Sequence, residues 1–265
     1  MSDISNPKVL PLFKSHYSIG KSILTLEISE KKNNSPVSIF SLAKEASLKE
    51  VVIVEDNFSG FLEAFKNAKA SKLKLIYGIR MYLTESIEDK TVEAECKRSK
   101  IIIFIKNTDG YNDLCKIWSV ASSEGLYSKN NNYVKMPHID YQNIKKLWTK
   151  NLKLAIPFYD SFIHMNVLDC GTCVPDFSFA KPIFFVEDNN LPFDNFILAK
   201  LNSYVKSMNY ETVETKTIYY ENREDYIAYI TARCINNRST IEKPDLNHMC
   251  SDEFCFESWK EAAYV

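Results

Sequence analysis

Short runs of consecutive apolar, mostly β-branched residues recur along this chain and are separated by stretches with helical periodicity. The clearest runs are residues 51–54 (VVIV) and 101–105 (IIIFI), which contain no polar position. Runs of this length are too short for helices and are typical of strands covered on both faces. Strands that alternate with helices predict parallel pairing in a right-handed series that closes into a barrel. The uneven spacing favours a distorted barrel over a regular eight-fold one.

The other expected elements follow from the same pattern. Strands are expected at 8–13, 51–54, 73–77 with an extension at 81–83, 101–105, 152–157, 182–186 and 211–217, and helices at 38–46, 58–70, 111–123, 138–148, 193–208 and 223–237. No break in composition marks two domains, so residues 1–237 are expected to form one barrel domain. Residues 238–265 are expected to be a C-terminal tail that packs irregularly on the barrel, with Trp259 near its end.

The charge balance limits the classes of function. The 265 residues include 33 Lys and Arg against 34 Asp and Glu, for a net charge of −1. Broad electrostatic capture of nucleic acid needs many uncompensated cations, so any DNA contact is expected to be local. No apolar run approaches the roughly 20 residues of a membrane span, and the N-terminus lacks a signal pattern, so a cytoplasmic protein is expected. Glycine-rich phosphate loops are missing from the sequence, so no cofactor is expected.

Four stretches, in order, resemble a known family. They are PLFKSHYS (11–18), VEDNFSGFLEAF (54–65), LKLIYGIRMYL (73–83) and IIIFIKNTDGYNDLCKI (101–117). They resemble the PHP (polymerase and histidinol phosphatase) domain, in the version that opens the alpha subunit of C-family bacterial replicative DNA polymerases. The element Lys106-Asn107-x-x-Gly110-Tyr111-x-x-Leu114-Cys115 is the most specific piece and is similar to polymerase-type members. The resemblance covers most of residues 8–237 and implies an α/β fold, a distorted TIM-like (β/α)7 barrel of the PHP type.

The resemblance identifies metal-binding positions at the ends of the first two strands. The family's first strand ends in a His-x-His pair. The second histidine matches His16, and the first falls at Lys14 or in a one-residue gap beside it. The family's second strand ends in Thr-Asp-His-Gly-Asn, which matches residues 53–57 and includes Glu55 and Asp56. A multinuclear hydrolytic site needs several His and carboxylate ligands around each metal. His16, Glu55 and Asp56 are therefore the candidates for a catalytic site, and the resemblance implies that this site is degenerate.

Cations stand at other ligand positions that the resemblance identifies. Arg80 replaces a family glutamate and Lys100 a family histidine. Lys216 begins the segment 216–220, in which Tyr219 replaces another histidine. Positive side chains repel a divalent metal, since unit charges about 4 Å apart interact by roughly 1 to 4 kcal/mol at effective dielectric constants of about 80 to 20. Hydrolytic activity is therefore disfavoured.

These cations allow two interpretations. The first is an anion pocket for phosphate or a DNA end, built from Arg80, Lys100 and Lys216 with His16 and Tyr219 beside them. The second is a set of internal salt bridges from these cations to Glu55, Asp56 and Glu187, which would replace the metals. We favour the salt bridges, because removing metals from a buried carboxylate site requires some such replacement.

The cysteines offer a weaker hypothesis. Seven of them, an odd number scattered over a long chain, fit reduced thiols better than a disulfide framework. Cys170 with Cys173 and Cys250 with Cys255 are weak candidates for a structural zinc site. The spacing of the second pair is unusual, and Cys255 lies between two phenylalanines, a common setting for a free buried cysteine. We therefore expect no metal.

Binding is the function that the resemblance implies. The chain would be a catalytically degenerate PHP-domain protein that acts in DNA replication as an accessory module for replication proteins. One alternative is a metal-dependent phosphoesterase or 3′–5′ exonuclease with a site rebuilt around His16, Glu55 and Asp56. Another is a phage protein that binds a host replication or defence factor in the host cytoplasm, since the pattern also resembles short stand-alone proteins of large tailed phages. The resemblance does not extend to a polymerase palm or fingers, so an enzyme is not the leading expectation.

Overall fold

The computed structural model describes residues 7–28, 36–128, 135–168, 171–241 and 251–263. These residues group into two compact units. Unit 1 comprises Met1–Tyr77, Glu187–Asp194 and Val213–Val265, and unit 2 comprises Gly78–Val186 and Asn195–Thr212. Strands β3 (Lys74–Thr84) and β9 (Glu211–Ile218) run through both units.

Unit 1 contains three parallel strands, β2 (Glu50–Glu55), β1 (Leu10–Phe13) and β9, with β1 in the middle. Phe13 lies opposite Ile53 on one side and Ile218 on the other. This register brings the carboxyl ends of all three strands to one edge. The residues that follow these strands therefore lie close together, and this edge is where the sequence predicts functional side chains.

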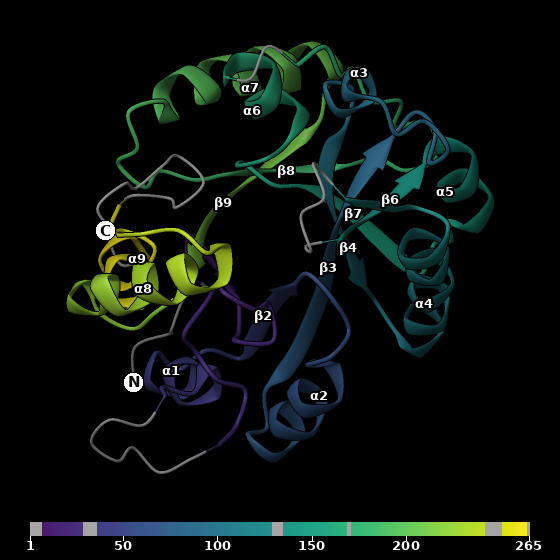
Figure 1. Ribbon diagram of the computed structural model, residues 1–265. Helices are drawn as coiled ribbons and strands as arrows, with labels where there is room; N and C mark the ends of the chain where they lie inside the picture. Colours follow the sequence, from purple (N-terminus) through teal and green to yellow (C-terminus); the bar gives the residue numbers. More distant parts are fainter. Residues whose placement is uncertain (1–6, 29–35, 129–134, 169–170, 242–250, 264–265) are drawn as a thin grey trace. The chain divides into compact units, whose positions relative to one another are not determined.

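The helices of unit 1 flank these strands (Figure 1). They are α1 (Ile39–Glu45), α2 (Phe61–Ala70), α8 (Tyr226–Asn237) with a 3-10 turn, η2 (Arg223–Asp225), before it, and α9 (Phe256–Ala263). Residues 51–55 of β2 are all buried, which accounts for the unbroken apolar run in the sequence.

Unit 2 contains a sheet in the order β8-β7-β4-β3-β6-β5. Its remaining strands are β4 (Ser99–Ile105), β5 (Leu126–Ser128), β6 (Lys135–Asp140), β7 (Leu152–Ile156) and β8 (Ile183–Val186). Its helices are α3 (Val92–Glu95), α4 (Thr108–Ser123), α5 (Tyr141–Leu147), α6 (Phe162–Leu168) and α7 (Asp194–Met208). Helix α4 packs on α5 and β6, as Figure 1 shows.

The hydrogen-bonded strand order closes on itself. It runs β2-β1-β9-β8-β7-β4-β3, and β2 also pairs with β3, so seven strands form a continuous ring of pairings. This is the strand order of an α/β barrel, and the fold class predicted from the sequence is confirmed.

Parallel pairing was wrongly predicted for one strand. β4 runs antiparallel to both of its neighbours, β3 and β7. Parallel neighbours need a crossover long enough to return to the start of the sheet, usually through a helix. Between β3 and β4 the described chain has only α3, a helix of four residues, so β4 returns beside β3 in the opposite direction.

The predicted helix at 138–148 is too long. Its first residues, including His138, belong to strand β6, and the helix begins only at Tyr141. Asp140 is the N-cap, and its side chain accepts a hydrogen bond from the amide of Asn143 at 2.8 Å. An N-cap aspartate is a recognisable start signal that places the boundary here.

The described part of the C-terminal tail is regular, in contrast to the irregular packing predicted for it. Phe256, Trp259 and Ala263 follow helical spacing and are buried, and they form the inner face of α9. The Trp259 indole donates a hydrogen bond to the Val9 carbonyl at 2.9 Å, beside β1. Helix α9 is therefore an integral part of unit 1.

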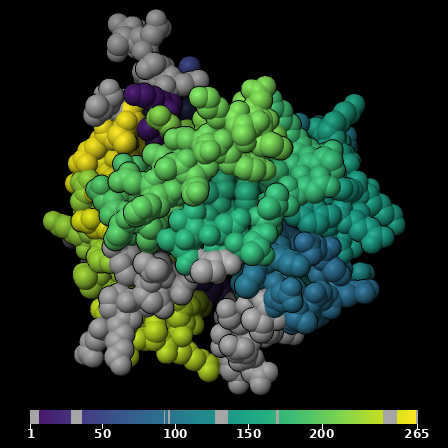
Figure 2. Space-filling view, turned by 90° about the horizontal axis from the view of Figure 1, so that it is seen from above, coloured from purple at the N-terminus to yellow at the C-terminus, as the bar shows by residue number. Residues whose placement is uncertain are grey.

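Helix α7 covers part of the surface of unit 2 and is green in Figure 2. Phe196 and Met208 on this helix are exposed, while the ring of Tyr204 contacts that of Phe162 on α6 at 5.1 Å. None of the helices in the described ranges is both long and apolar enough to cross a membrane.

Candidate functional site

A buried lysine occupies the carboxyl end of β1. The Lys14 side chain is only 1% exposed, and its ammonium lies 2.9 Å from Asp56, which follows β2. The other carboxylate oxygen of Asp56 lies 2.7 Å from the half-exposed Lys21. The parallel pairing of β1 with β2 sets this contact, because it carries both side chains to the same edge.

Glu55, the last residue of β2, is fully buried beside this ion pair. It accepts a hydrogen bond from the Ser15 amide at 2.8 Å and another from the Ser18 hydroxyl. Burial raises the pKa of Glu55, and the Lys14 ammonium offsets only part of that rise. Both carboxylate oxygens already accept hydrogen bonds from the β1 turn, so they hold that turn in place.

His16 does not join this cluster through any described hydrogen bond. It is exposed, and its Nδ1 lies 3.3 Å from the Leu24 carbonyl. The ring lies against Tyr17, with ring centroids 4.5 Å apart. A carbonyl partner makes Nδ1 the protonated nitrogen, which leaves Nε2 as the possible acceptor.

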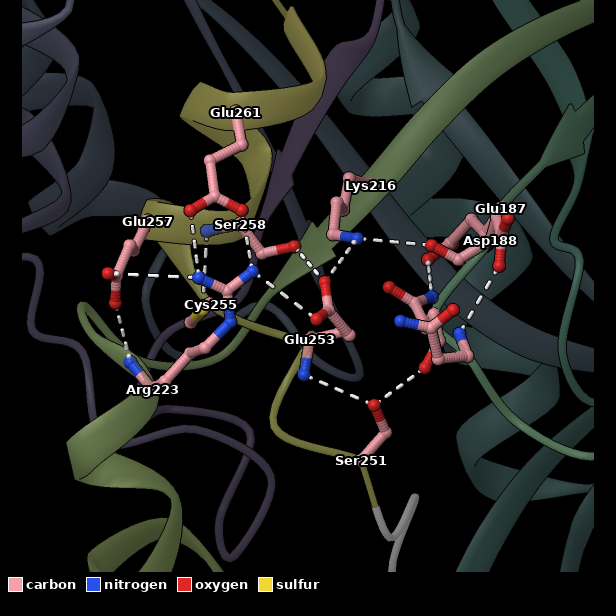
Figure 3. A network of polar contacts seen from close by, with 12 residues as sticks. Glu187, Asp188, Lys216, Arg223, Ser251, Glu253, Cys255, Glu257, Ser258 and Glu261 are labelled. Atoms are coloured by element: carbon pink, nitrogen blue, oxygen red, sulfur yellow. Dashed lines mark hydrogen bonds and ion pairs between the residues drawn. The ribbon is translucent and has the colours of Figure 1, made fainter.

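Lys216 belongs to a second cluster of unit 1, shown in Figure 3. Its ammonium lies 3.3 Å from Glu253 in the tail and donates to the Asp188 carbonyl at 3.1 Å. Arg223 lies 3.3 Å from the same Glu253 and 2.6 Å from Glu261 on α9. A tail carboxylate therefore neutralises Lys216, one of the three cations considered from the sequence.

The pKa of Glu253 reflects this arrangement. Burial acts to raise it, but the Ser258 hydroxyl, the Lys216 ammonium and the Arg223 guanidinium together hold the pKa below its usual value. Glu253 is therefore a stable anion, fixed in place from three sides (Figure 3).

Glu187 accepts hydrogen bonds at the end of β9. It accepts hydrogen bonds from the amide and the hydroxyl of Thr217, at 3.0 and 2.7 Å, and from the Asn189 side chain at 3.1 Å. It thus fixes the end of β9 through neutral donors. Tyr219 on the same segment is buried and stacks on Tyr229 with ring centroids 5.3 Å apart.

In unit 2, Asp160 joins the two remaining predicted cations. Its carboxylate lies 2.7 Å from the Lys100 ammonium and 3.6 Å from the Arg80 guanidinium. Burial acts to raise the pKa of Asp160, but Lys100 and Arg80 outweigh it and hold that pKa well below its ordinary value. Asp160 adopts a left-handed backbone conformation with φ of 61°, which is uncommon outside glycine.

The described carboxylate partners of the predicted cations are Asp160 for Lys100 and Arg80, and Glu253 for Lys216. Sequence reasoning missed both partners and the ion pair of Lys14 with Asp56. Asp160 had a recognisable signal, since it follows strand β7 and so lies at a carboxyl end. Glu253 had none, because its place depends on how the tail folds back.

Within the described residues, no group of three or more His, Cys, Asp or Glu side chains is arranged to hold a metal ion. Cys170 and Cys250 lie outside the described residues. Of the four cysteines of the predicted zinc site, the structure therefore describes Cys173 and Cys255. Cys173 is in unit 2 and Cys255 in unit 1, and both are buried free thiols. Burial raises the pKa of Cys173 to about 12 and that of Cys255 to about 11.

We expect Cys173 and Cys255 to react slowly with iodoacetamide in the native protein at pH 8. The thiolate is the reacting species, and a raised pKa makes it scarce. Peptide mass spectrometry should show labelling at least about ten-fold slower than at Cys96 and Cys115, which are partly exposed. Rapid labelling that appears only after a chelator is added would contradict this and indicate zinc-bound thiolates.

The family model of the PHP domain matches residues 27–168. The chain is 26% identical over 228 residues to the DNA polymerase III subunit alpha of Aquifex aeolicus and 26% identical over 224 residues to that of Thermus aquaticus. These alignments cover 80% and 77% of this chain but 19% and 17% of the relatives. The chain thus spans about a fifth of the length of the curated relatives it matches.

A solved structure is also similar. It is a protein from Bifidobacterium adolescentis for which metal-dependent phosphoesterase activity has been proposed. The TM-score is 0.38 at 10% identity, with 75% of this chain and 85% of the other covered.

Proposed function

The chain belongs to the PHP domain family, and from that premise we propose that it has lost hydrolytic chemistry and acts in DNA replication as a binding module. The observation that carries this proposal is the buried Lys14 ammonium, 2.9 Å from Asp56 at the joint end of β1 and β2. An ammonium has three donors and no acceptor, so it cannot ligate a metal. It also gives Asp56 the positive partner that a metal would otherwise provide.

The other charged clusters support the same proposal. Lys100 and Arg80 neutralise Asp160, and Lys216 neutralises Glu253. Carboxylates with fixed cationic partners are poor metal ligands, because binding would first have to displace the cation. The residues at the family's ligand positions thus do not fit a multinuclear metal centre, and we derive no hydrolytic step for them.

The loss of chemistry is tested by measuring metal content and hydrolysis. We expect less than about 0.1 equivalent of Zn, Mn or Fe per chain after purification and dialysis with each metal, and no release of nucleotides from single-stranded DNA with a free 3′ end. His16→Ala and Glu55→Gln are the matched controls for trace contaminants. Stoichiometric metal together with cleavage that both variants abolish would contradict the proposal.

The binding role rests on the relatives, which are DNA polymerase III alpha subunits. We expect the tagged chain to retain replication proteins from cell extract at physiological salt, and the retained protein to bind again when both are purified. The near-neutral net charge argues that such binding would not be general adhesion to nucleic acid. Nuclease treatment of the extract is the control, and a bound fraction without any replication component would refute the replication role.

A further inference from the structure

Helix α8 of unit 1 has an apolar outer face, where a surface helix normally carries charged side chains. Ile227 is 61% exposed and Ile235 is 74% exposed. Ala228 is exposed on the same side and Thr231 is partly exposed. Arg233 is the single charged residue within α8, and it is buried. Scattered exposed apolar residues are common, but an uncharged stripe along two helical turns is typical of a contact surface.

This face is symmetric about its middle residue. Ile227 and Ile235 each stand four positions from Thr231, about one turn to either side. The exposed Glu224 stands seven positions before Thr231, in η2, and the exposed Arg238 stands seven positions after it, at the C-cap. Apolar side chains and opposite charges are thus arranged evenly on both sides of one point. A contact around a two-fold axis requires a surface that is complementary to itself in this way.

The polar group at the centre of the face is already satisfied. The Thr231 hydroxyl donates a hydrogen bond to the Ile227 carbonyl at 2.7 Å. Burial of Thr231 against another molecule would therefore leave no donor without a partner. Its neighbours Ala228 and Ala232 are small, so another helix can approach the backbone of α8 closely at this point.

A turn of unit 1 adjoins one end of the face. A Cβ atom added to Gly20 would lie 2.3 Å from the Cβ of Asn236, so the backbone there packs on the last turn of α8. Ile19, the preceding residue, is 74% exposed and adds an apolar side chain beside that end. One helix face and one turn cover less than the roughly 800 Å² per partner of a standard interface. A contact of this size supports an association that depends on protein concentration.

We propose that α8 packs antiparallel against α8 of a second copy of this chain, around a two-fold axis at Thr231. This arrangement sets Ile227 of each copy near Ile235 of the other. It also brings Glu224 toward Arg238 of the other copy, whereas a parallel arrangement would set each charge beside its like. An unrelated partner would not require symmetry in this face, so the symmetry favours a second copy. The proposal is independent of hydrolytic chemistry and of the replication role.

Sedimentation velocity of the full chain at about 5 to 200 µM tests the contact. Wild-type protein should shift from monomer toward dimer over this range. Ile235→Lys should raise the dimer dissociation constant about ten-fold or more, because the two-fold axis repeats the change on both sides. Leu62→Lys is the matched control, since Leu62 is 60% exposed on another helix of unit 1, α2, and it should leave the constant unchanged. A wild-type chain that stays monomeric, or an equal loss in Leu62→Lys, would overturn the proposal.

The charges at the two ends of α8 test its direction in the contact. Glu224→Lys should weaken dimerisation about three-fold or more, because it brings a second cation toward Arg238 of the other copy. Combining it with Arg238→Glu should restore the wild-type dissociation constant, a result that lowered stability of the monomer could not produce. A dissociation constant that is unchanged in Glu224→Lys would contradict the antiparallel direction.

A disulfide across the axis locates the centre of the contact. Thr231→Cys chains should cross-link to each other under mild oxidation, because a residue on a two-fold axis meets its own copy and a disulfide needs Cα atoms within about 7 Å. Wild-type protein is the control for the native cysteines. Ile227→Cys and Ile235→Cys chains should cross-link more when mixed than when each is oxidised alone. If Ile227→Cys cross-linked with itself as readily as Thr231→Cys, the helices would be parallel and the proposal would be wrong.

Discussion

Replacing Lys14 by methionine is expected to lower the free energy of unfolding by about 3–5 kcal/mol, because it removes one partner of a buried ion pair. Lys14 is 1% exposed, lies 2.9 Å from Asp56, and its charge acts to lower the pKa of the buried Glu55. Methionine fills similar volume, so the loss reflects charge and not a cavity. Urea denaturation followed by circular dichroism measures the change. Lys21→Met is the matched control, since Lys21 pairs with the same Asp56 from the surface and should cost less than about 1 kcal/mol.

The loss of unfolding free energy in Lys14→Met, relative to wild type, should grow as the pH rises from 5 to 8. Burial already raises the pKa of Glu55, and loss of the Lys14 ammonium removes an influence that lowers it. A carboxyl whose pKa is higher in the folded than in the unfolded protein stabilises the fold at low pH, and this contribution is lost as the pH rises through the folded pKa. Adding Glu55→Gln should therefore restore part of the stability at pH 8 and flatten the pH dependence. A Lys14→Met variant within about 1 kcal/mol of wild type at every pH would refute the role of the ion pair.

The sequence predicted strands and helices well where the local pattern of apolar and polar side chains sets the structure. The apolar runs at 51–54 and 101–105 form parts of β2 and β4 and are buried except for the partly exposed Ile105. The segment that begins at Lys106 leads into α4, which is capped by Asn107. These features depend on neighbours within a few positions in the chain. The family resemblance rested on the same local patterns, and the family match over residues 27–168 confirms it.

The direction of a strand and the partners of an ion pair were harder to predict, because both depend on distant parts of the chain. The antiparallel course of β4 is set by how the chain turns after Thr84, and the short α3 gave little sequence signal. Lys100 pairs with Asp160, which is 60 positions away in the sequence, and Lys216 pairs with Glu253, which is 37 positions away. A lysine or arginine within the family pattern therefore predicted that a carboxylate would lie nearby. The sequence did not identify which carboxylate it would be.

Replacing Trp259 by alanine is expected to lower the free energy of unfolding by about 3–5 kcal/mol, the range for truncating a large buried aromatic side chain. Trp259 is fully buried, stacks on Phe256 with centroids 5.2 Å apart, and donates to the Val9 carbonyl. The same change loosens α9, whose Ser258 holds Glu253 against Lys216. The tail thus stabilises both the start of β1 and the charge balance at the end of β9.

Urea denaturation of three variants separates these contributions. Trp259→Phe keeps most of the packing and loses the indole hydrogen bond, so it should cost less than Trp259→Ala by about 2 kcal/mol. Lys260→Ala, on the outer face of α9 and paired with Glu45 at 3.0 Å, should cost less than about 1 kcal/mol. If Trp259→Ala were as mild as Lys260→Ala, the tail would be a loose appendage, and Glu253 could not be the fixed partner of Lys216. If the large loss is observed, a deletion that removes α9 should yield a chain that fails to unfold cooperatively. It would expose an apolar surface beside β1 and remove the Ser258 hydroxyl that holds Glu253 against Lys216.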